Sequence, residues 1–285
     1  MFPAPFTYHR ATSVSEALSL LQQHADTGKV LAGGHSLLPI MKLRLAQPEH
    51  IIDISGIDEL RSISFGADSV TIGALVTHRE LATNNELAEA VPLIQQMARV
   101  VGDQQVRNLG TIGGALAHAD PAADYPAGML ALDVTVLVTG PNGDREIPIV
   151  EFFQGFLTTA LEPDELLTGI RIPTLPAGAG SAYEKLPNPA SGYATVGVAA
   201  VAVKADDGSI ADLRVGITGA SDVAWRATVV EEALKGTSPD EAAIKAAAAQ
   251  ATDGVEMLDD KHGPADYRAR VTRNLVRRAI ARAIA

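Results

Sequence analysis

The sequence predicts an α+β fold built from more than one lobe. Helical and strand-like patterns are mixed along the chain without regular alternation, which argues against a doubly wound parallel sheet. A stretch rich in proline and glycine at residues 173–180 indicates a boundary between lobes. With 285 residues, the chain is also long enough to bury a sizeable core in more than one domain.

The N-terminal part predicts a βαβ-like unit. Apolar residues at helical spacing over residues 13–24 indicate a helix, and the apolar run 29–32 indicates a strand that ends in a glycine pair. A second helix is expected near residues 37–45, followed by a strand at residues 51–54. We assign residues 1–56 to an N-terminal lobe.

The middle part, residues 57–176, predicts a mixed or antiparallel sheet. Alternation on both sides of a turn indicates a β-hairpin over residues 61–73. Helical patterns run from residue 80 to about residue 101, and residues 102–126, rich in Gly, Ala and Asp, have a length typical of a functional loop. Further strands are expected at residues 134–138, 146–150 and 166–172.

The last part, residues 177–285, predicts a lobe of sheet and helices. Apolar strand patterns occupy residues 196–204 and 210–218, on either side of a turn rich in Asp and Gly. Helices are expected near residues 228–234, 239–251 and 265–284.

Composition excludes several classes of function. A formal net charge of -11 argues against binding to nucleic acid and to anionic membranes. The chain has no cysteine, so a disulfide or a cysteine-bound iron–sulphur cluster on this chain is excluded. No basic leader and no apolar run near the ~20 residues of a membrane helix is visible. We therefore expect a cytoplasmic protein without a transmembrane segment.

Residues for metal or acid–base catalysis do not form a recognisable pattern. Seven histidines are present, but none has the i, i+4 spacing of a zinc-binding helix, so no metal site is expected. No G-x-S-x-G nucleophile motif occurs either. We expect no catalytic side chains on this chain.

The first candidate binding segment is Ala32-Gly33-Gly34-His35-Ser36, which lies between a predicted strand and a predicted helix. Glycines let the backbone turn and let a ligand approach the amides closely. The free N–H groups that precede a helix favour an anion such as a diphosphate. A tight turn with a serine cap explains the same residues, so this segment alone leaves both interpretations open.

The second candidate segment comprises Gly110, Thr111, Ile112, Gly113, Gly114 and Ala115. It leads to Asp120 and Asp124, whose carboxylates can accept hydrogen bonds from sugar or polyol hydroxyls. Its amides could hold the other side of a diphosphate, or the glycines could serve a tightly packed crossover. Neither segment matches the Rossmann G-x-G-x-x-G or the Walker lysine loop, which argues against an ordinary NAD or ATP site.

Taken together, the motifs resemble the FAD-binding subunits of molybdenum hydroxylases, the family that contains xanthine dehydrogenase. Within it, the chain resembles the medium subunits of aerobic carbon monoxide dehydrogenases. The resemblance covers essentially the whole chain, with matching motifs in order at residues 31–42, 107–114, 120–126, 165–173, 183–186 and 263–268. It implies the vanillyl-alcohol-oxidase-type (PCMH-like) FAD-binding fold, with an N-terminal, a middle and a C-terminal lobe.

The resemblance also implies a set of FAD contacts. The backbones of Ala32 to Ser36 and of Thr111 to Ala115 would cradle the FAD diphosphate. Asp124 would meet flavin-side hydroxyls, and Val101 and Leu167 would line the adenine or ring pocket.

Two further residues are implied near the isoalloxazine. Lys185 would stabilise the reduced, anionic flavin, and Tyr193 would shield one face of the ring. The sequence departs from the family at two places: Ala115 stands where many relatives have Asn, and residues 187–193 lack the charged residues found around that tyrosine in carbon monoxide dehydrogenase. A side-chain hydrogen bond is therefore expected to be missing at Ala115.

The function that the resemblance implies is electron transfer. A large partner subunit would carry the molybdenum cofactor and a small partner subunit the iron–sulphur clusters, in a dimer of heterotrimers. FAD on this chain would pass the electrons to an external acceptor. For the activity of the whole complex, carbon monoxide dehydrogenase is the first candidate, followed by an aldehyde, nicotine or N-heterocycle hydroxylase. A self-sufficient flavin oxidase and a non-catalytic nucleotide-binding module remain as alternatives.

The C-terminal helix is rich in arginine. We interpret the row as a solvated face of an amphipathic helix, with Tyr267, Val271, Leu275 and Ile284 packing inward. Docking onto an acidic partner subunit is the alternative. The row consists of Arg268, Arg270, Arg273, Arg277, Arg278 and Arg282.

Overall fold

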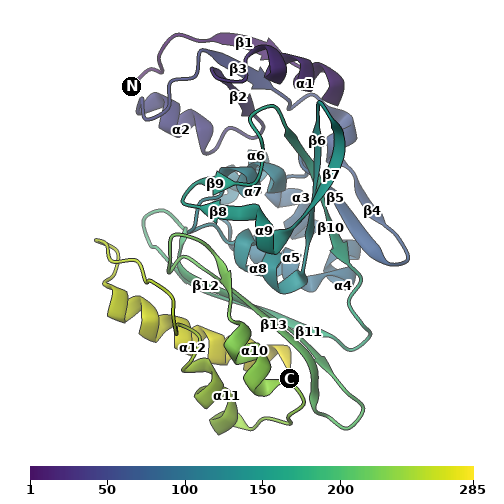
Figure 1. Cartoon of the computed structure of the whole chain (residues 1–285), viewed down its shortest axis with the longest axis vertical. Coiled ribbons are helices and arrows are strands. Elements are labelled where there is room, and N and C mark those ends of the chain that lie inside the picture. The colour runs from purple at the N-terminus through teal and green to yellow at the C-terminus, as the bar shows by residue number, and fades with distance from the viewer.

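The computed structural model describes residues 1–285 and has three lobes, each with its own sheet (Figure 1). In the N-terminal lobe, the strands β1 (Thr7–Arg10), β3 (His50–Asp53) and β2 (Gly28–Leu31) lie in this order and are all parallel. The helices α1 (Val14–Gln23) and α2 (Leu37–Lys42) connect them, so the expected βαβ arrangement is confirmed. Strand β1 was not predicted, because its four residues are mostly exposed and carry no apolar alternation.

The middle lobe contains a five-stranded antiparallel sheet with the order β4-β5-β10-β6-β7. Its strands are β4 (Ile63–Phe65), β5 (Ser69–Gly73), β10 (Leu166–Pro173), β6 (Thr135–Gly140) and β7 (Gly143–Pro148). The hairpin expected at residues 61–73 is therefore confirmed. The strand expected at residues 146–150 ends earlier, at Pro148.

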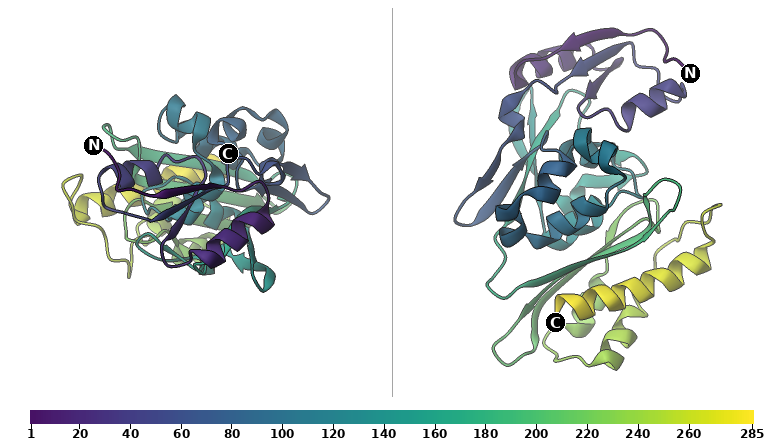
Figure 2. Two further views of the ribbon diagram at one scale, coloured as in Figure 1. Left: turned by 90° about the horizontal axis from the view of Figure 1, so that it is seen from above. Right: turned by 180° about the vertical axis from the view of Figure 1, so that it is seen from behind.

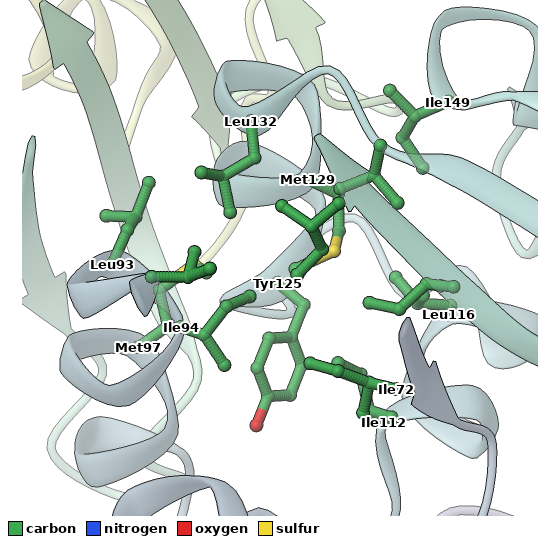
Figure 3. Packing of buried hydrophobic residues seen from close by; sticks show 14 of the residues in the cluster. Ile72, Leu93, Ile94, Met97, Ile112, Leu116, Tyr125, Met129, Leu132 and Ile149 are labelled. Carbon is green, nitrogen blue, oxygen red and sulfur yellow. The ribbon is translucent and has the colours of Figure 1, made fainter. Parts of the chain in front are cut away.

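Helices cover one face of the middle sheet (Figure 2, right). Tyr125 and Met129 lie at the centre of the core between helices and sheet, with Ile72, Ile94 and Ile112 around them (Figure 3). The helices are α3 (His78–Thr83), α4 (Asn85–Ala90), α5 (Pro92–Val100), α6 (Gln104–Leu109), α7 (Ile112–His118) and α8 (Tyr125–Leu132). Four small elements complete the lobe, which are η1 (Asp58–Arg61) before β4, and α9 (Ile149–Phe152), β8 (Phe153–Gly155) and β9 (Thr158–Thr159) after β7.

The interpretation of residues 102–126 as one extended loop was wrong. This stretch contains α6 and α7 and runs into the first turn of α8. Each of the first two helices begins at a capping side chain, because Asp103 accepts from the amide of Val106 and Thr111 from that of Gly114. Neither helix exceeds seven residues, so no amphipathic period develops that the sequence pattern could show.

The C-terminal lobe has a sheet in the order β11-β12-β13-β14. Its strands are β11 (Gly180–Pro187), β12 (Ala194–Lys204), β13 (Ile210–Thr218) and β14 (Trp225–Arg226). One face carries the long helix α12 (Ala265–Ala283), together with α10 (Thr228–Leu234) and α11 (Glu241–Ala248). In Figure 2, right, α12 runs along the side of the sheet that faces away from the middle lobe. The other face packs against α8 of the middle lobe, and β12 is therefore buried over most of its length.

The chain segment just before α8 joins the middle and C-terminal lobes by backbone hydrogen bonds. The amide of Ala194 donates to the carbonyl of Ala122 at 3.0 Å, and the amide of Gly219 donates to that of Pro121 at 2.7 Å. The hydroxyl of Thr218 donates to the same Pro121 carbonyl and to that of Ala123. The two lobes are thus held together at residues 121–123.

The interpretation of the arginine row as a solvated face was wrong for Arg268. Its side chain is buried and donates to the carbonyls of Thr195 and Gly219 and to the carboxylate of Asp260. Burial is tolerated because these acceptors satisfy the guanidinium. Tyr267, which was expected to pack inward, is instead 37% exposed.

Two other arginines of α12 form ion pairs within the lobe. Arg278 and Arg282 both contact the carboxylate of Glu184, a buried residue of β11, with a distance of 2.7 Å for Arg278. Arg277 pairs with Glu241. A charge reversal at Arg278 would therefore disturb this lobe itself, so it does not isolate docking onto a partner.

Replacing Arg282 with glutamate is expected to destabilise the chain by about 1–3 kcal/mol, because Glu184 is buried and loses a charged hydrogen-bond partner. Arg270→Glu is the matched control on the same helix, since Arg270 pairs only with the exposed Asp266. Urea unfolding measures both. Equal effects of the two variants would contradict the role assigned to Glu184.

No helix of the structure is both long enough and apolar enough to cross a membrane.

Candidate functional site

The two glycine segments of the sequence come together in the structure. A Cβ atom added to Gly33 would lie 2.0 Å from the carbonyl oxygen of Leu109 and 2.8 Å from the Cα of Gly110. A Cβ on Gly114 would lie 3.8 Å from the Cβ of Ala32. The first segment therefore packs directly on the start of the second, at the junction of the N-terminal and middle lobes.

The first segment, Ala32 to Ser36, has a row of amides without acceptors. None of its five N–H groups donates a hydrogen bond to the chain, although all five residues are half-buried. Gly34 has a φ of 72°, which favours glycine, and the ring of His35 contacts the carbonyl of Gly33 at 3.0 Å. Half-buried amides without partners need an acceptor, and consecutive amides of this kind suit an anion.

The second segment is organised differently. The amides of Ile112, Gly113, Gly114 and Ala115 donate to the Val76 carbonyl, the Ala74 carbonyl, the Thr111 hydroxyl and the Thr111 carbonyl, respectively. These four groups are already satisfied, in contrast to the amides of the first segment. A Cβ on Gly113 would collide with Ala74 at 2.5 Å, whereas one on Gly114 would meet only the Thr111 hydroxyl at 2.8 Å. Gly114 thus keeps the space between the segments open.

Asp124 and Lys185 form a buried ion pair. The Lys185 ammonium lies 2.8 Å from the Asp124 carboxylate, and both side chains are almost fully buried. Lys185 also donates to the carbonyls of Val100 at 2.9 Å and Gly192 at 2.7 Å, so all three ammonium hydrogens have partners. The hydroxyl of Tyr183 donates to the same carboxylate at 2.6 Å.

Burial raises the pKa of the Asp124 carboxyl, and Lys185 and Tyr183 oppose this rise. Burial, followed by the charge of Asp124, raises the pKa of Tyr183 well above its ordinary value. The phenol therefore keeps its proton and remains a donor to Asp124 at physiological pH.

Tyr193 lies near Ser36 of the first glycine segment and near Asp120 and Asp124. Burial of its phenol is the main cause of a raised pKa, followed by the charge of Asp120, while the nearby Ser36 side chain acts in the opposite direction. The residue as a whole is 39% exposed. An aromatic ring in this position can cover a planar group held by the neighbouring segments.

Leu167 and Val101 belong to the edge of the middle core. Leu167, in β10, is buried, and Val101 is partly buried against the same cluster. Val101 directly precedes the turn at Gly102, whose Cα would lie 3.3 Å from a Cβ on Gly192. Val101 is thereby placed near the Lys185 contacts, whereas Leu167 is a residue of the sheet core.

Sequence reasoning missed a buried histidine beneath the glycine segments. His78 opens α3, and its Nδ1 lies 3.0 Å from the hydroxyl of Tyr125. Its Nε2 is next to Gly110, where a Cβ would approach to 2.7 Å. Burial, followed by the charges of His35 and Arg107, lowers the pKa of His78 to about 4. No pattern in the sequence marks this residue, because its partners lie more than 30 positions away.

The lowered pKa of His78 predicts acid sensitivity of the fold. In the unfolded chain the imidazole has its ordinary pKa near 6.5, so between pH 6.5 and 4 the unfolded state binds a proton that the folded state does not. The free energy of unfolding should fall by about 3 kcal/mol as the pH drops through this window.

Urea unfolding at pH 7.5 and at pH 4.5 measures this effect. His78→Asn, which keeps a hydrogen-bonding group near Tyr125, should remove most of the difference. His262→Gln, in an exposed loop, should leave it unchanged. An identical pH dependence in His78→Asn and the unsubstituted chain would show that other groups cause it.

Comparison with models of protein families identifies the family of the chain. A model described as the FAD binding domain in molybdopterin dehydrogenase matches residues 4–175. A second model, the CO dehydrogenase flavoprotein C-terminal domain, matches residues 181–283. The chain belongs to this flavoprotein family. Its α+β architecture is that of an FAD-binding subunit of the molybdenum hydroxylases, as the resemblance implied.

Individual relatives of this flavoprotein align with it over nearly their whole length. The chain is 40% identical over 280 residues to the carbon monoxide dehydrogenase medium chain of Hydrogenophaga pseudoflava, covering 98% of this chain and 97% of that one. It is 36% identical to the glyceraldehyde dehydrogenase medium chain of Sulfolobus acidocaldarius, covering 98% of each. A solved carbon monoxide dehydrogenase from Hydrogenophaga pseudoflava, which lacks the Mo-pyranopterin moiety of the molybdenum cofactor, superposes with a TM-score of 0.96 at 42% identity, covering 99% and 98% of the two chains.

The flavoprotein is thus an oxidoreductase subunit with FAD as its cofactor. Medium chains belong to complexes with a large and a small partner, and the molybdenum cofactor and the iron–sulphur clusters are on those partners. The absence of cysteine from this chain agrees with that division.

Proposed function

We propose that this chain is the FAD-carrying electron-transfer subunit of an aerobic carbon monoxide dehydrogenase. It would receive electrons from the iron–sulphur clusters of the small partner and pass them to an external acceptor. The observation that carries the proposal is the row of unpaired, half-buried amides from Ala32 to Ser36, in a chain that resembles carbon monoxide dehydrogenase medium chains from end to end. Bound FAD would supply the redox chemistry, because it can accept and release electrons.

In this proposal the two glycine segments have different tasks. The amides of Ala32 to Ser36 donate to the diphosphate of FAD, which supplies the acceptors that they lack. Thr111, Ile112, Gly113, Gly114 and Ala115 act mainly by shape, since the last four amides are engaged within the chain. Their small side chains let the ligand approach the first segment closely.

Lys185 is proposed as a positioning residue. A free cation near the isoalloxazine would stabilise a reduced, anionic flavin, but the charge of Lys185 is balanced by Asp124. Its three hydrogen bonds tie the end of α5, the start of α8 and the turn at Gly192 to one point. The pair thereby places Tyr193, which would cover the isoalloxazine, close behind the first glycine segment. Asp124 is engaged by Lys185 and Tyr183, so we propose that it acts through this pair and does not bind flavin-side hydroxyls directly. Of the two apolar residues, the partly buried Val101 would provide surface beside the pair, whereas the buried Leu167 would support it from the sheet core.

The visible absorption spectrum of the purified chain, with and without added FAD, tests the cofactor site. A flavin spectrum, with FAD as the species released on denaturation, supports the proposed contacts. A chain that stays colourless both alone and when co-expressed with its partner subunits would refute them. The substrate is tested separately by adding carbon monoxide, under exclusion of oxygen, to the complete complex and recording the bleaching of the flavin absorption.

An aldehyde is the second candidate substrate, because the glyceraldehyde dehydrogenase medium chain is nearly as similar as the carbon monoxide dehydrogenase chain. Bleaching by glyceraldehyde and not by carbon monoxide would favour it. A nicotine or other N-heterocycle substrate would be tested in the same way. Bleaching of the isolated chain by any of these compounds would instead indicate a self-sufficient flavin oxidase, and flavin that no partner can reduce would indicate a nucleotide-binding module.

We also propose a dimer of heterotrimers as the assembly and residues 1–56, 57–176 and 177–285 as the domains. The separate sheets and the family matches to residues 4–175 and 181–283 support these boundaries. The mass of the complete complex in solution tests the stoichiometry. The cytoplasmic location stays a prediction.

A further inference from the structure

The N-terminal lobe brings three histidines together that are far apart in the sequence. One nitrogen from each of His9, His24 and His50 lies within 4.8 Å of the nitrogens of the other two. They come from β1, from the residue that follows α1 and from β3. None of them belongs to the glycine segments or to the Asp124 network.

The strand register explains why two of them share a face. In the parallel pairing of β1 with β3, Thr7 lies opposite His50 and His9 lies opposite Ile52. Residues two positions apart on a strand point to the same side of a sheet. His9 and His50 therefore both lie on the face that carries Ile52, which is fully buried.

The helix α1 supplies the third histidine from above this face. Its buried residues are Ala17 and Leu21, and His24 continues that stripe three positions after Leu21. The apolar core of the lobe ends at His24, because an apolar residue at this position would have extended the core by one more side chain. The chain instead places three partly exposed imidazoles at the edge of the core, within reach of solvent.

The contacts among the three rings show that they form one cluster. The Nε2 of His9 lies 3.0 Å from the Nδ1 of His50, and the rings of His24 and His50 stack with their centroids 3.7 Å apart. The ring of His9 stacks on that of His24 at 5.1 Å.

We propose that His9, His24 and His50 form a binding site for one divalent transition-metal ion of the Zn²⁺ or Cu²⁺ type. Imidazole suits these ions, and the cluster contains no carboxylate, the ligand that Mg²⁺ and Ca²⁺ prefer. Three protein ligands and a water complete a tetrahedral Zn²⁺ coordination. The lone pair of an imidazole lies in the plane of its ring, so one ring of the stacked pair must rotate towards the ion. Such an ion would fix β1 and the end of α1 to β3.

Equilibrium dialysis of the full-length, FAD-loaded chain against Zn²⁺, with the bound metal measured by mass spectrometry, tests the proposal. The unsubstituted chain should retain one Zn²⁺ per chain. His24→Gln and, separately, His9→Gln should each weaken binding at least about tenfold, because each removes one of three ligands. His262→Gln, a histidine outside the cluster, should bind as the unsubstituted chain does.

Two further measurements keep the result specific. Flavin absorption and the unfolding temperature without Zn²⁺ show whether a variant has folded. If either His24→Gln or His9→Gln does not fold, the other of these two variants carries the test. With Cu²⁺ as the probe, electron paramagnetic resonance should show coupling to nitrogen atoms that is lost in His24→Gln. Absence of a stoichiometric Zn²⁺ in the unsubstituted chain, or equal binding in all the variants, would overturn the proposal and leave the histidines as a stacked end of the core.

Discussion

Replacing Gly114 with valine is expected to abolish the retention of FAD. A side chain at this position points into the space between the two glycine segments, where only the Thr111 hydroxyl and the Cβ of Ala32 are near. The Thr111 hydroxyl, 2.8 Å from the new Cβ, must shift, but no backbone atom is in the way, and the new side chain displaces the diphosphate from the amides of Ala32 to Ser36. Losing even two charge-assisted hydrogen bonds, at about 1.5–3 kcal/mol each, would weaken binding more than a hundredfold. Titration of the apoprotein with FAD, followed by flavin fluorescence, measures the loss.

Gly66→Val is the matched control. Gly66 is exposed at the tip of the hairpin between β4 and β5, and a Cβ there would meet only the carbonyl oxygen of Ser69, at 3.2 Å. This variant should bind FAD as the unsubstituted chain does. Gly33→Val is a poorer test, because its side chain would collide with the backbone of Leu109 and disturb the packing of both segments. FAD binding by folded Gly114→Val with unchanged affinity would show that the diphosphate lies elsewhere.

Replacing Lys185 with methionine is expected to lower the free energy of unfolding by about 3–5 kcal/mol. The substitution leaves the buried Asp124 carboxylate with Tyr183 as its only side-chain donor, and the carbonyls of Val100 and Gly192 lose a partner. The apolar part of the side chain has a similar length, so packing changes little. Chemical unfolding of the apoprotein, monitored by circular dichroism, gives the loss without interference from the cofactor.

The double variant Asp124→Asn/Lys185→Met provides the control for the charge. Removing both charges should recover at least about 1 kcal/mol relative to the sum of the two single variants, since no uncompensated charge is then buried. Strictly additive effects would mean that the pair contributes no coupling. In that case Lys185 would act through its carbonyl contacts alone.

The sequence predicts the sheets of this protein better than the connections between them. The hairpin formed by β4 and β5 and the strands β12 and β13 follow from local alternation and from turns that contain glycine. The first glycine segment was placed correctly between a strand and a helix for the same reason. These features depend on residues that are neighbours in the chain, so a local pattern can reveal them.

The parts that were missed depend on distant residues. The helices α6 and α7 are too short to show a period, and their position depends on packing such as that of Gly113 on Ala74. The pairing of Lys185 with Asp124 joins residues 61 positions apart, and the histidine cluster joins three separate elements. Neither composition nor spacing reveals contacts between such distant residues, because the register of the sheets and the packing of the lobes determine them.

The hydrogen bonds that residues 121–123 form with Ala194, Thr218 and Gly219 have a consequence for the biosynthesis of the protein. Residues 121–123 can form these hydrogen bonds only after β13 and Gly219, which follows it, have been synthesised. Contacts of such large sequence separation form late in folding. A nascent chain that has left the ribosome only as far as the middle lobe would therefore expose an incomplete nucleotide site, and insertion of the cofactor would await nearly complete translation. The FAD content of an assembled complex would then measure the fraction of its chains that had been fully translated before they bound their partner subunits.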